Sequence, residues 1–288
     1  MNYKETCFRA LYKHFVAFML KDNLRQCIEN YPDADKANCI LTYGYIDREA
    51  GLTMEVLCAG YKSGDEFFFF DQNKEHRVIL RVGSVEEDEF YLFDDSDGRL
   101  QKKYADKIEI LKDYEASEEV EEARKMEFLD KLRHEHYPDD VMVYLTREGL
   151  NPEGCWVRII GLGDHFIMGT LLNEPDQDFG YHEGEKIAFF VQKTEDDQII
   201  CFSNMTPSRK LKAEDLEDGT LLKEAVSIFN KERNEEHFID ILEFLRDSYV
   251  WIPCNAVMSE ADMARFEQAM KDAGDDPSAM VGEEFTTN

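Results

Sequence analysis

Residues 40–46 read Ile-Leu-Thr-Tyr-Gly-Tyr-Ile, a short run of β-branched and aromatic side chains of the kind that is enriched in β-strands. Similar runs lie at residues 54–58, 67–70, 78–82 and 90–93. Turn-forming residues such as Ser63-Gly64-Asp65 separate them, which is typical of strands joined by hairpins. The segment from Cys39 to Leu111 is therefore predicted to form an antiparallel meander of about five strands.

A second group of strand-like runs lies between Val141 and Phe202, and it predicts a second antiparallel sheet. Its runs lie at residues 141–145, 155–161, 165–172, 186–191 and 198–202. The two groups share a local similarity, because residues 61–70 and 181–190 both place Tyr, Gly, an acid and two Phe at the same spacing. This similarity indicates duplicated modules. The alternative is that both copies use a common turn before a strand.

The rest of the chain has helical patterns. Apolar residues in 8–19 follow the i, i+3, i+4, i+7 spacing, which predicts a helix that runs to about Ile28 and ends before Pro32. A charged stretch, 115–136, predicts a helix that joins the two sheets. After Ser203 the spacing is again helical.

The sequence thus predicts an α+β fold: two antiparallel strand blocks joined by a charged helix, with a helix-rich C-terminal part. The expected domains are residues 1–114, 115–138, 139–205 and 206–288.

The composition is strongly acidic. Lys and Arg total 33 against 62 Asp and Glu, so the formal net charge is −29. The 20 Phe and 13 Tyr are too many for a disordered polyanion, so the charge coats a folded body. A field of this sign repels phosphate groups, which argues against direct binding to nucleic acid or to an anionic membrane surface. It favours a basic protein partner.

Several observations bear on the compartment. No apolar run approaches the ~20 residues of a membrane span, and the first residues lack the layout of a signal peptide. The seven cysteines are scattered without a C-x-x-C pair, which indicates buried, reduced thiols and a cytoplasmic protein.

Known metal and cofactor signatures fail when their spacing is checked. A calcium loop around Gly98 would need carboxylates at Phe93 and Tyr104. The best metal candidate is His134-Glu135-His136, but i and i+2 histidines on a helix point apart. We therefore expect no bound metal and no cofactor. The alternative function is a small hydrolase or metal-dependent enzyme that uses Asp164, His165 and His182 in the second block.

Carboxylates gather at predicted turns, where they form either a solvated hairpin rim or a docking surface for Lys and Arg. The candidate binding residues are Glu86, Glu87, Asp88, Glu89, Asp94, Asp95 and Asp97 in the first block, with Asp176 and Asp178 in the second.

Two stretches resemble known families. Residues 238–254, where Leu245 and Ser248 lead to an apolar strand that reaches Pro253, resemble the opening of SseB-type (enhanced serine sensitivity) domains. The further strands of such a domain do not follow before Asn288, so the resemblance implies a partial unit. Residues 155–190, with a Trp-Val strand and a Gly-x-x-x-Asn-x-Pro turn, are similar to uncharacterised bacterial domains found among predicted immunity proteins of toxin systems.

Neither family brings known catalytic residues. The resemblances imply a bacterial, non-enzymatic protein-binding module, with an immunity or regulatory role against a basic partner such as a nuclease toxin.

Overall fold

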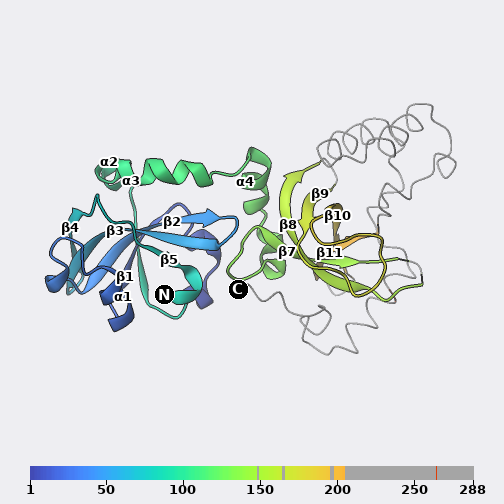
Figure 1. Cartoon of the computed structure of the whole chain (residues 1–288), viewed down its shortest axis with the longest axis horizontal. Helices are drawn as coiled ribbons and strands as arrows, with labels where there is room; N and C mark the ends of the chain where they lie inside the picture. Colours follow the sequence, from blue (N-terminus) through green and yellow to red (C-terminus); the bar gives the residue numbers. More distant parts are fainter. Residues whose placement is uncertain (148, 164–165, 195–197, 205–263, 265–288) are drawn as a thin grey trace. The chain divides into compact units, whose positions relative to one another are not determined.

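A computed structural model of the chain describes residues 1–147, 149–163, 166–194, 198–204 and 264. These residues form two compact units (Figure 1). The first unit comprises Met1–Ala116 and His134–Pro138, and the second comprises Ser117–Arg133 and the described residues from Asp139 onward. Both units combine antiparallel strand pairs with short helices, so the α+β class is confirmed. The expected C-terminal helices and the SseB-like stretch lie outside the described residues.

The first unit is built on a six-stranded antiparallel sheet in the order β4-β3-β2-β1-β6, with β5 beside β3. The strands are β1 (Phe15–Met19), β2 (Cys39–Asp47), β3 (Gly51–Ser63), β4 (Glu66–Gln72), β5 (Ile79–Arg81) and β6 (Phe90–Phe93). The α-helices are α1 (Asp22–Cys27), α2 (Arg99–Lys103) and α3 (Ala105–Ile110). The 3-10 helices are η1 (Tyr3–Glu5), η2 (Phe8–Ala10), η3 (Ala34–Lys36), η4 (Val82–Ser84) and η5 (Leu111–Tyr114).

The helix predicted over residues 8–28 is wrong. Its middle is the strand β1, which pairs with β2 on one side and β6 on the other. Phe15 to Phe18 are all buried, so both faces of this strand are covered. A short apolar run that is buried on both faces has no alternation, and its spacing also fits a helix. Within the predicted range, only the 3-10 helix η2 and the six-residue helix α1 are helical.

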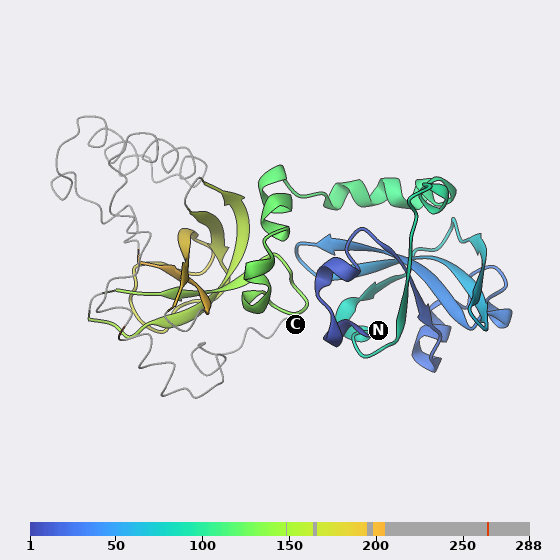
Figure 2. The same ribbon diagram turned by 180° about the vertical axis from the view of Figure 1, so that it is seen from behind.

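All five strands predicted between residues 39 and 111 are present, and the pairs β2–β3 and β3–β4 follow the chain as a meander should. The meander then breaks, because β6 pairs with β1 rather than with β5. Residues 99–110 are helical, so the strand block ends earlier than predicted. Helices α2 and α3 run across the sheet (Figure 2), and Tyr104 and Ile108 pack there against Leu41 and Leu57.

Two edge strands of this sheet, β4 and β6, meet through aromatic rings. The centre of the Phe67 ring lies 5.2 Å from that of the Tyr91 ring and 5.1 Å from that of the Phe93 ring. The centres of the Phe69 and Phe93 rings are also 5.1 Å apart. Gly60 makes room for one of these rings, since a Cβ at this position would lie only 2.8 Å from the Phe69 ring. We call these four aromatic residues the aromatic seam. It joins two strands between which the structure forms no ladder of hydrogen bonds within the described residues.

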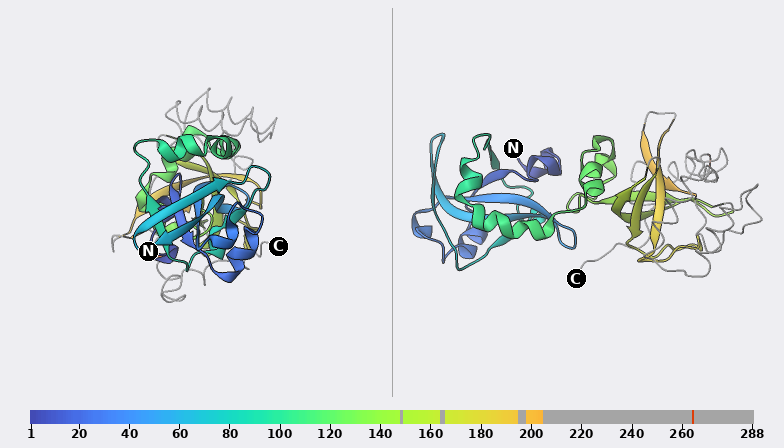
Figure 3. Two further views of the ribbon diagram at one scale, coloured as in Figure 1. Left: turned by 90° about the vertical axis from the view of Figure 1, so that its left-hand side faces the viewer. Right: turned by 90° about the horizontal axis from the view of Figure 1, so that it is seen from above.

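The second unit is a closed five-stranded barrel in the order β10-β11-β7-β8-β9 (Figure 3). Its strands are β7 (Asp140–Leu145), β8 (Glu153–Leu162), β9 (Ile167–Leu171), β10 (Lys186–Lys193) and β11 (Ile199–Ser203). Consecutive strands are antiparallel and the closing pair, β11–β7, is parallel. An odd number of alternating strands makes this unavoidable, because the fifth runs in the same direction as the first. The predicted antiparallel block is therefore present, and its closure is an addition to the prediction.

The prediction of a single joining helix over residues 115–138 is wrong. The segment forms α4 (Glu118–Arg124) and the 3-10 helix η6 (Glu127–Leu132), both within the second unit. Val120 and Ala123 are buried on α4, but the next position of that stripe is the exposed Glu127. The chain bends there, and Leu129 is buried instead. Among the described residues, none of the helices has the length and apolar character needed to cross a bilayer.

The similar decapeptides occupy corresponding places in the two units. Each lies at the connection from the third strand to the fourth, and both Gly64 and Gly184 have a positive φ in the turn before that strand. The resemblance ends at the tyrosines, since Tyr61 is exposed in β3 whereas Tyr181 is buried in a loop. The last described strands of the two units also differ, because β6 is antiparallel to β1 and β11 is parallel to β7.

Candidate functional site

The acidic run 86–89 forms the loop between η4 and β6, and its four carboxylates have different surroundings. Glu86 accepts a hydrogen bond of 2.6 Å from Nε2 of His136 and lies 3.0 Å from the ammonium of Lys4. Both contacts lower the pKa of Glu86, and the hydrogen bond from His136 has a larger effect than that from Lys4. Glu86 therefore joins the N-terminal residues to the segment 134–138, which is a structural role.

Asp88 is buried, with 6% of its surface exposed, and forms an ion pair with Lys21. The prediction that Asp88 binds a partner is therefore wrong, because its carboxylate is not exposed to solvent. Glu87 and Glu89 are exposed. Glu87 lies 2.9 Å from the ammonium of Lys4, and Glu89 accepts a hydrogen bond of 3.0 Å from the hydroxyl of Tyr91.

The three aspartates after β6 shape the turn that leads into α2. Asp95 accepts hydrogen bonds from the backbone N–H groups of Leu100 and Gln101, at 2.7 and 2.8 Å, and so caps the helix. Asp94 and Asp97 are exposed, and each accepts from a backbone N–H two residues further on. These are the local bonds by which aspartate stabilises turns.

The four exposed carboxylates at the two ends of β6 are named the β6 rim. They are Glu87, Glu89, Asp94 and Asp97. The two acids predicted in the second unit, Asp176 and Asp178, are also exposed. They lie in a loop held by the buried Glu153, which accepts from the backbone N–H of Asp176 at 2.6 Å.

The tripeptide His134-Glu135-His136 contributes to one group of possible metal ligands. Ligand atoms of Glu86, Glu135 and His136 lie within 4.8 Å of one another. The ammonium of Lys4 already lies against Glu86, and a cation in that place repels a metal ion. His134 does not take part, since its ring packs edge-on against Tyr137 at 5.0 Å.

Of the three residues of the alternative catalytic group, only His182 lies among the described residues. Asp164 and His165 lie outside the described residues, so the proposed acid–base pair stays a prediction. His182 is exposed and its Nδ1 lies 2.7 Å from a carboxylate oxygen of Glu174. This contact, followed by a hydrogen bond from the backbone N–H of Glu183, lowers the pKa of Glu174. Such a pair orients an imidazole, but among the described residues the hydrogen-bond partner of the His182 imidazole is a carboxylate rather than a nucleophile.

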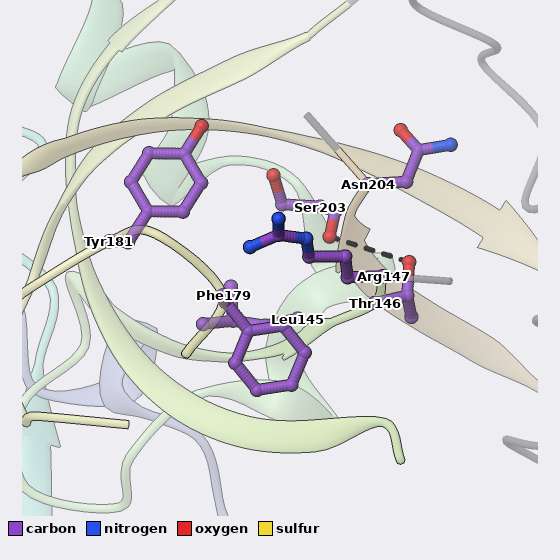
Figure 4. A pocket seen from close by; sticks show the side chains of 7 residues that line it. All are labelled: Leu145, Thr146, Arg147, Phe179, Tyr181, Ser203 and Asn204. Carbon is purple, nitrogen blue, oxygen red and sulfur yellow. Dashed lines mark hydrogen bonds between the residues drawn. The ribbon is translucent and has the colours of Figure 1, made fainter. Parts of the chain in front are cut away.

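A small hollow lies at one end of the barrel, where β7 and β11 stop. Its lining residues are Leu145, Thr146, Arg147, Phe179, Tyr181, Ser203 and Asn204. The guanidinium of Arg147 extends between Tyr181 and Phe179 (Figure 4), and it donates a 2.9 Å hydrogen bond to the carbonyl of Asp178. The volume, about 10 Å³, suits a single water molecule and is far below that of a pocket for an organic ligand.

Comparison of the chain with known protein families, with characterised proteins and with solved structures finds no match. The two resemblances drawn from short motifs therefore stay predictions.

Sequence reasoning located the acids but missed their partners. Lys21 is 67 positions from Asp88, and His136 is 50 positions from Glu86. No local pattern could reveal these pairs, because the sheet brings the residues together. The aromatic seam had a partial signal, the four consecutive phenylalanines at 67–70, which marked a strand but not its contact with β6.

Proposed function

We propose that this chain is a non-enzymatic protein-binding module that binds a basic protein partner, with the β6 rim as the principal contact in the first unit. The observation that carries the proposal is the exposure of all four rim carboxylates at the two ends of one edge strand, on a chain of net charge −29. Charge of one sign concentrated around a sheet edge attracts an oppositely charged protein over several ångströms and speeds its association.

The resemblance of residues 155–190 to predicted immunity proteins makes a basic toxin one member of the partner class. We also propose a cytoplasmic location. It is supported by the six described cysteines, which form no disulfide and four of which are buried. Buried thiols are stable in a reducing compartment.

The test is association kinetics with a partner isolated by in-cell crosslinking and purified. The rim variant changes Glu87 and Glu89 to Gln and Asp94 and Asp97 to Asn. A matched control makes the same change of charge at other exposed acids of the first unit: Asp22→Asn, Asp33→Asn, Asp35→Asn and Glu109→Gln.

We expect the on-rate of the unmodified chain to fall by about tenfold between low and high salt, since charge steering is screened beyond ~8 Å at physiological ionic strength. The rim variant should bind more slowly than the control variant, with little change in off-rate. An on-rate that neither salt nor the rim variant alters would contradict the proposal.

A further inference from the structure

Strand β4 has a hydrogen-bonded neighbour on one side only. In the described residues its ladder is with β3, and it ends the path of the sheet. The outer side of such a strand carries a row of backbone N–H and C=O groups that can pair with another extended chain. Its sequence, Glu-Phe-Phe-Phe-Phe-Asp-Gln over residues 66–72, contains neither the proline nor the lysine that commonly protects an edge.

One face of the sheet at this edge carries large aromatic side chains that are exposed to solvent. Phe68 is 53% exposed, and Tyr61, which lies directly opposite it on β3, is 45% exposed. Two neighbouring aromatic side chains with so much surface in water favour a binding partner that covers them.

The charges around β4 select the occupant. Asp65, Glu66 and Asp71 are all exposed and bracket the four phenylalanines. A second copy of the chain, paired antiparallel along β4, would bring Glu66 close to Asp71 of its partner, and like charges across a strand pair are destabilising. A strand with Lys or Arg near its ends would instead meet opposite charges.

The aromatic seam beside β4 already holds a cation. The ammonium of Lys62 lies 5.6 Å from the centre of the Phe67 ring and 5.1 Å from that of Tyr91. These rings therefore already have a cation–π partner, so the basic side chains of an added segment would pair with the flanking acids rather than with the seam.

We infer that β4 is a strand-addition edge that accepts an extended basic segment of a partner protein. The main chain of the segment pairs with the outer side of β4, its apolar side chains pack against Phe68, and its Lys or Arg side chains pair with the flanking acids. The inference rests on the proposed function, because it names the segment that a basic partner would present.

The test uses a seven-residue peptide with valines at its centre and lysines at both ends, and a counterpart in which glutamate replaces lysine. Binding to the full chain is followed by fluorescence anisotropy and by amide hydrogen exchange. The basic peptide should slow exchange in residues 66–72 and leave 39–47 unchanged, and the acidic peptide should not bind. Phe68→Ser should weaken binding at least tenfold, whereas Ile110→Ser, a similarly exposed residue (51%) of the first unit, should not.

The outcomes separate this inference from the proposed function. Salt-sensitive binding of the basic peptide without protection of 66–72 would overturn the strand-addition site and leave the basic partner in place. Equal binding of the two peptides, or binding unaffected by Phe68→Ser, would also overturn it. Absence of binding at millimolar basic peptide would overturn it too, while the partner kinetics decide the proposed function on their own.

Discussion

Arg124 and Asp139 form a bidentate ion pair in the second unit, with Nε 2.8 Å from Oδ1 and Nη2 2.7 Å from Oδ2. Both side chains are almost fully buried, at 3% and 4% exposure. The pair connects α4 to the residue that precedes β7, so it holds the helix against the barrel. Two parallel charge-assisted hydrogen bonds give such a pair a defined geometry.

Replacement of one member of this pair should be costly. Arg124→Ala leaves the carboxylate of Asp139 buried without its main counter-charge, and we expect a loss of about 3–5 kcal/mol in the free energy of unfolding. Urea unfolding followed by tryptophan fluorescence measures it, in a Trp251→Phe background so that Trp156 in β8 is the reporter. The exposed Arg99→Ala is the control and should change stability by less than about 0.5 kcal/mol. A loss of similar size in both variants would show that the pair has no special role.

The cysteines should differ sharply in reactivity. Cys7 and Cys27 are exposed, whereas Cys39, Cys58, Cys155 and Cys201 are buried. Burial raises the pKa of the Cys58 thiol to about 11 and those of the other three to about 12, and a protonated thiol is a poor nucleophile.

We expect two thiols to react rapidly with a disulfide reagent at pH 8 and four more to react only in denaturant. The experiment uses Cys254→Ser, because Cys254 lies outside the described residues. Rapid reaction of more than two thiols in the native protein would contradict the burial of the four.

Gly44 should not tolerate a side chain. A Cβ at this position would lie 2.0 Å from the carbonyl oxygen of Leu11, and Gly44 also accepts a 2.8 Å hydrogen bond from the backbone N–H of Lys13. Gly44→Ala should therefore push the N-terminal segment off β2, at a cost of about 3 kcal/mol.

Hydrogen exchange at Lys13 gives the local measurement, and it should speed up strongly in Gly44→Ala. The control is Gly64→Ala, where a Cβ has open space but the φ of +58° is unfavourable for alanine. Exchange at Lys13 should be unchanged in that control.

The contacts of Glu86 should make stability depend on acid pH. Its pKa is lowered in the folded chain by His136 and Lys4, so the stabilisation is fully present above the unfolded value of about 4.5. It is lost as the pH falls through the lowered folded pKa. Glu86→Gln removes this linkage.

The stability difference between the unmodified chain and Glu86→Gln should therefore be largest near neutral pH and shrink toward pH 3 in urea unfolding. Glu109→Gln, which removes only an exposed carboxylate paired with Lys112, should show a weaker trend. A difference that does not change with pH would exclude the linkage.

The sequence alone was sufficient to place ten of the strands, because runs of β-branched and aromatic residues bounded by turn residues are local properties. It failed at β1, since the apolar residues in 8–19 also fit the spacing of a helix, and Phe15 to Phe18, buried on both faces, show no alternation that would mark a strand. It also failed for 115–136, where helix propensity is high throughout but α4 buries one stripe and the chain must then bend to bury Leu129.

Only the tertiary structure decided how the strands close into a barrel and which charged side chains form ion pairs or stay exposed. The second block becomes a barrel because β11 reaches β7, a pairing between strands more than fifty residues apart. Asp88 and Glu87 are adjacent in the same acidic run, yet Asp88 is buried and paired with the exposed Lys21, whereas Glu87 is itself exposed. Strand and turn patterns can be recognised from residues that are close together in the sequence. Burial and ion pairing depend on residues that are far apart in the sequence and that only the folded sheet brings together.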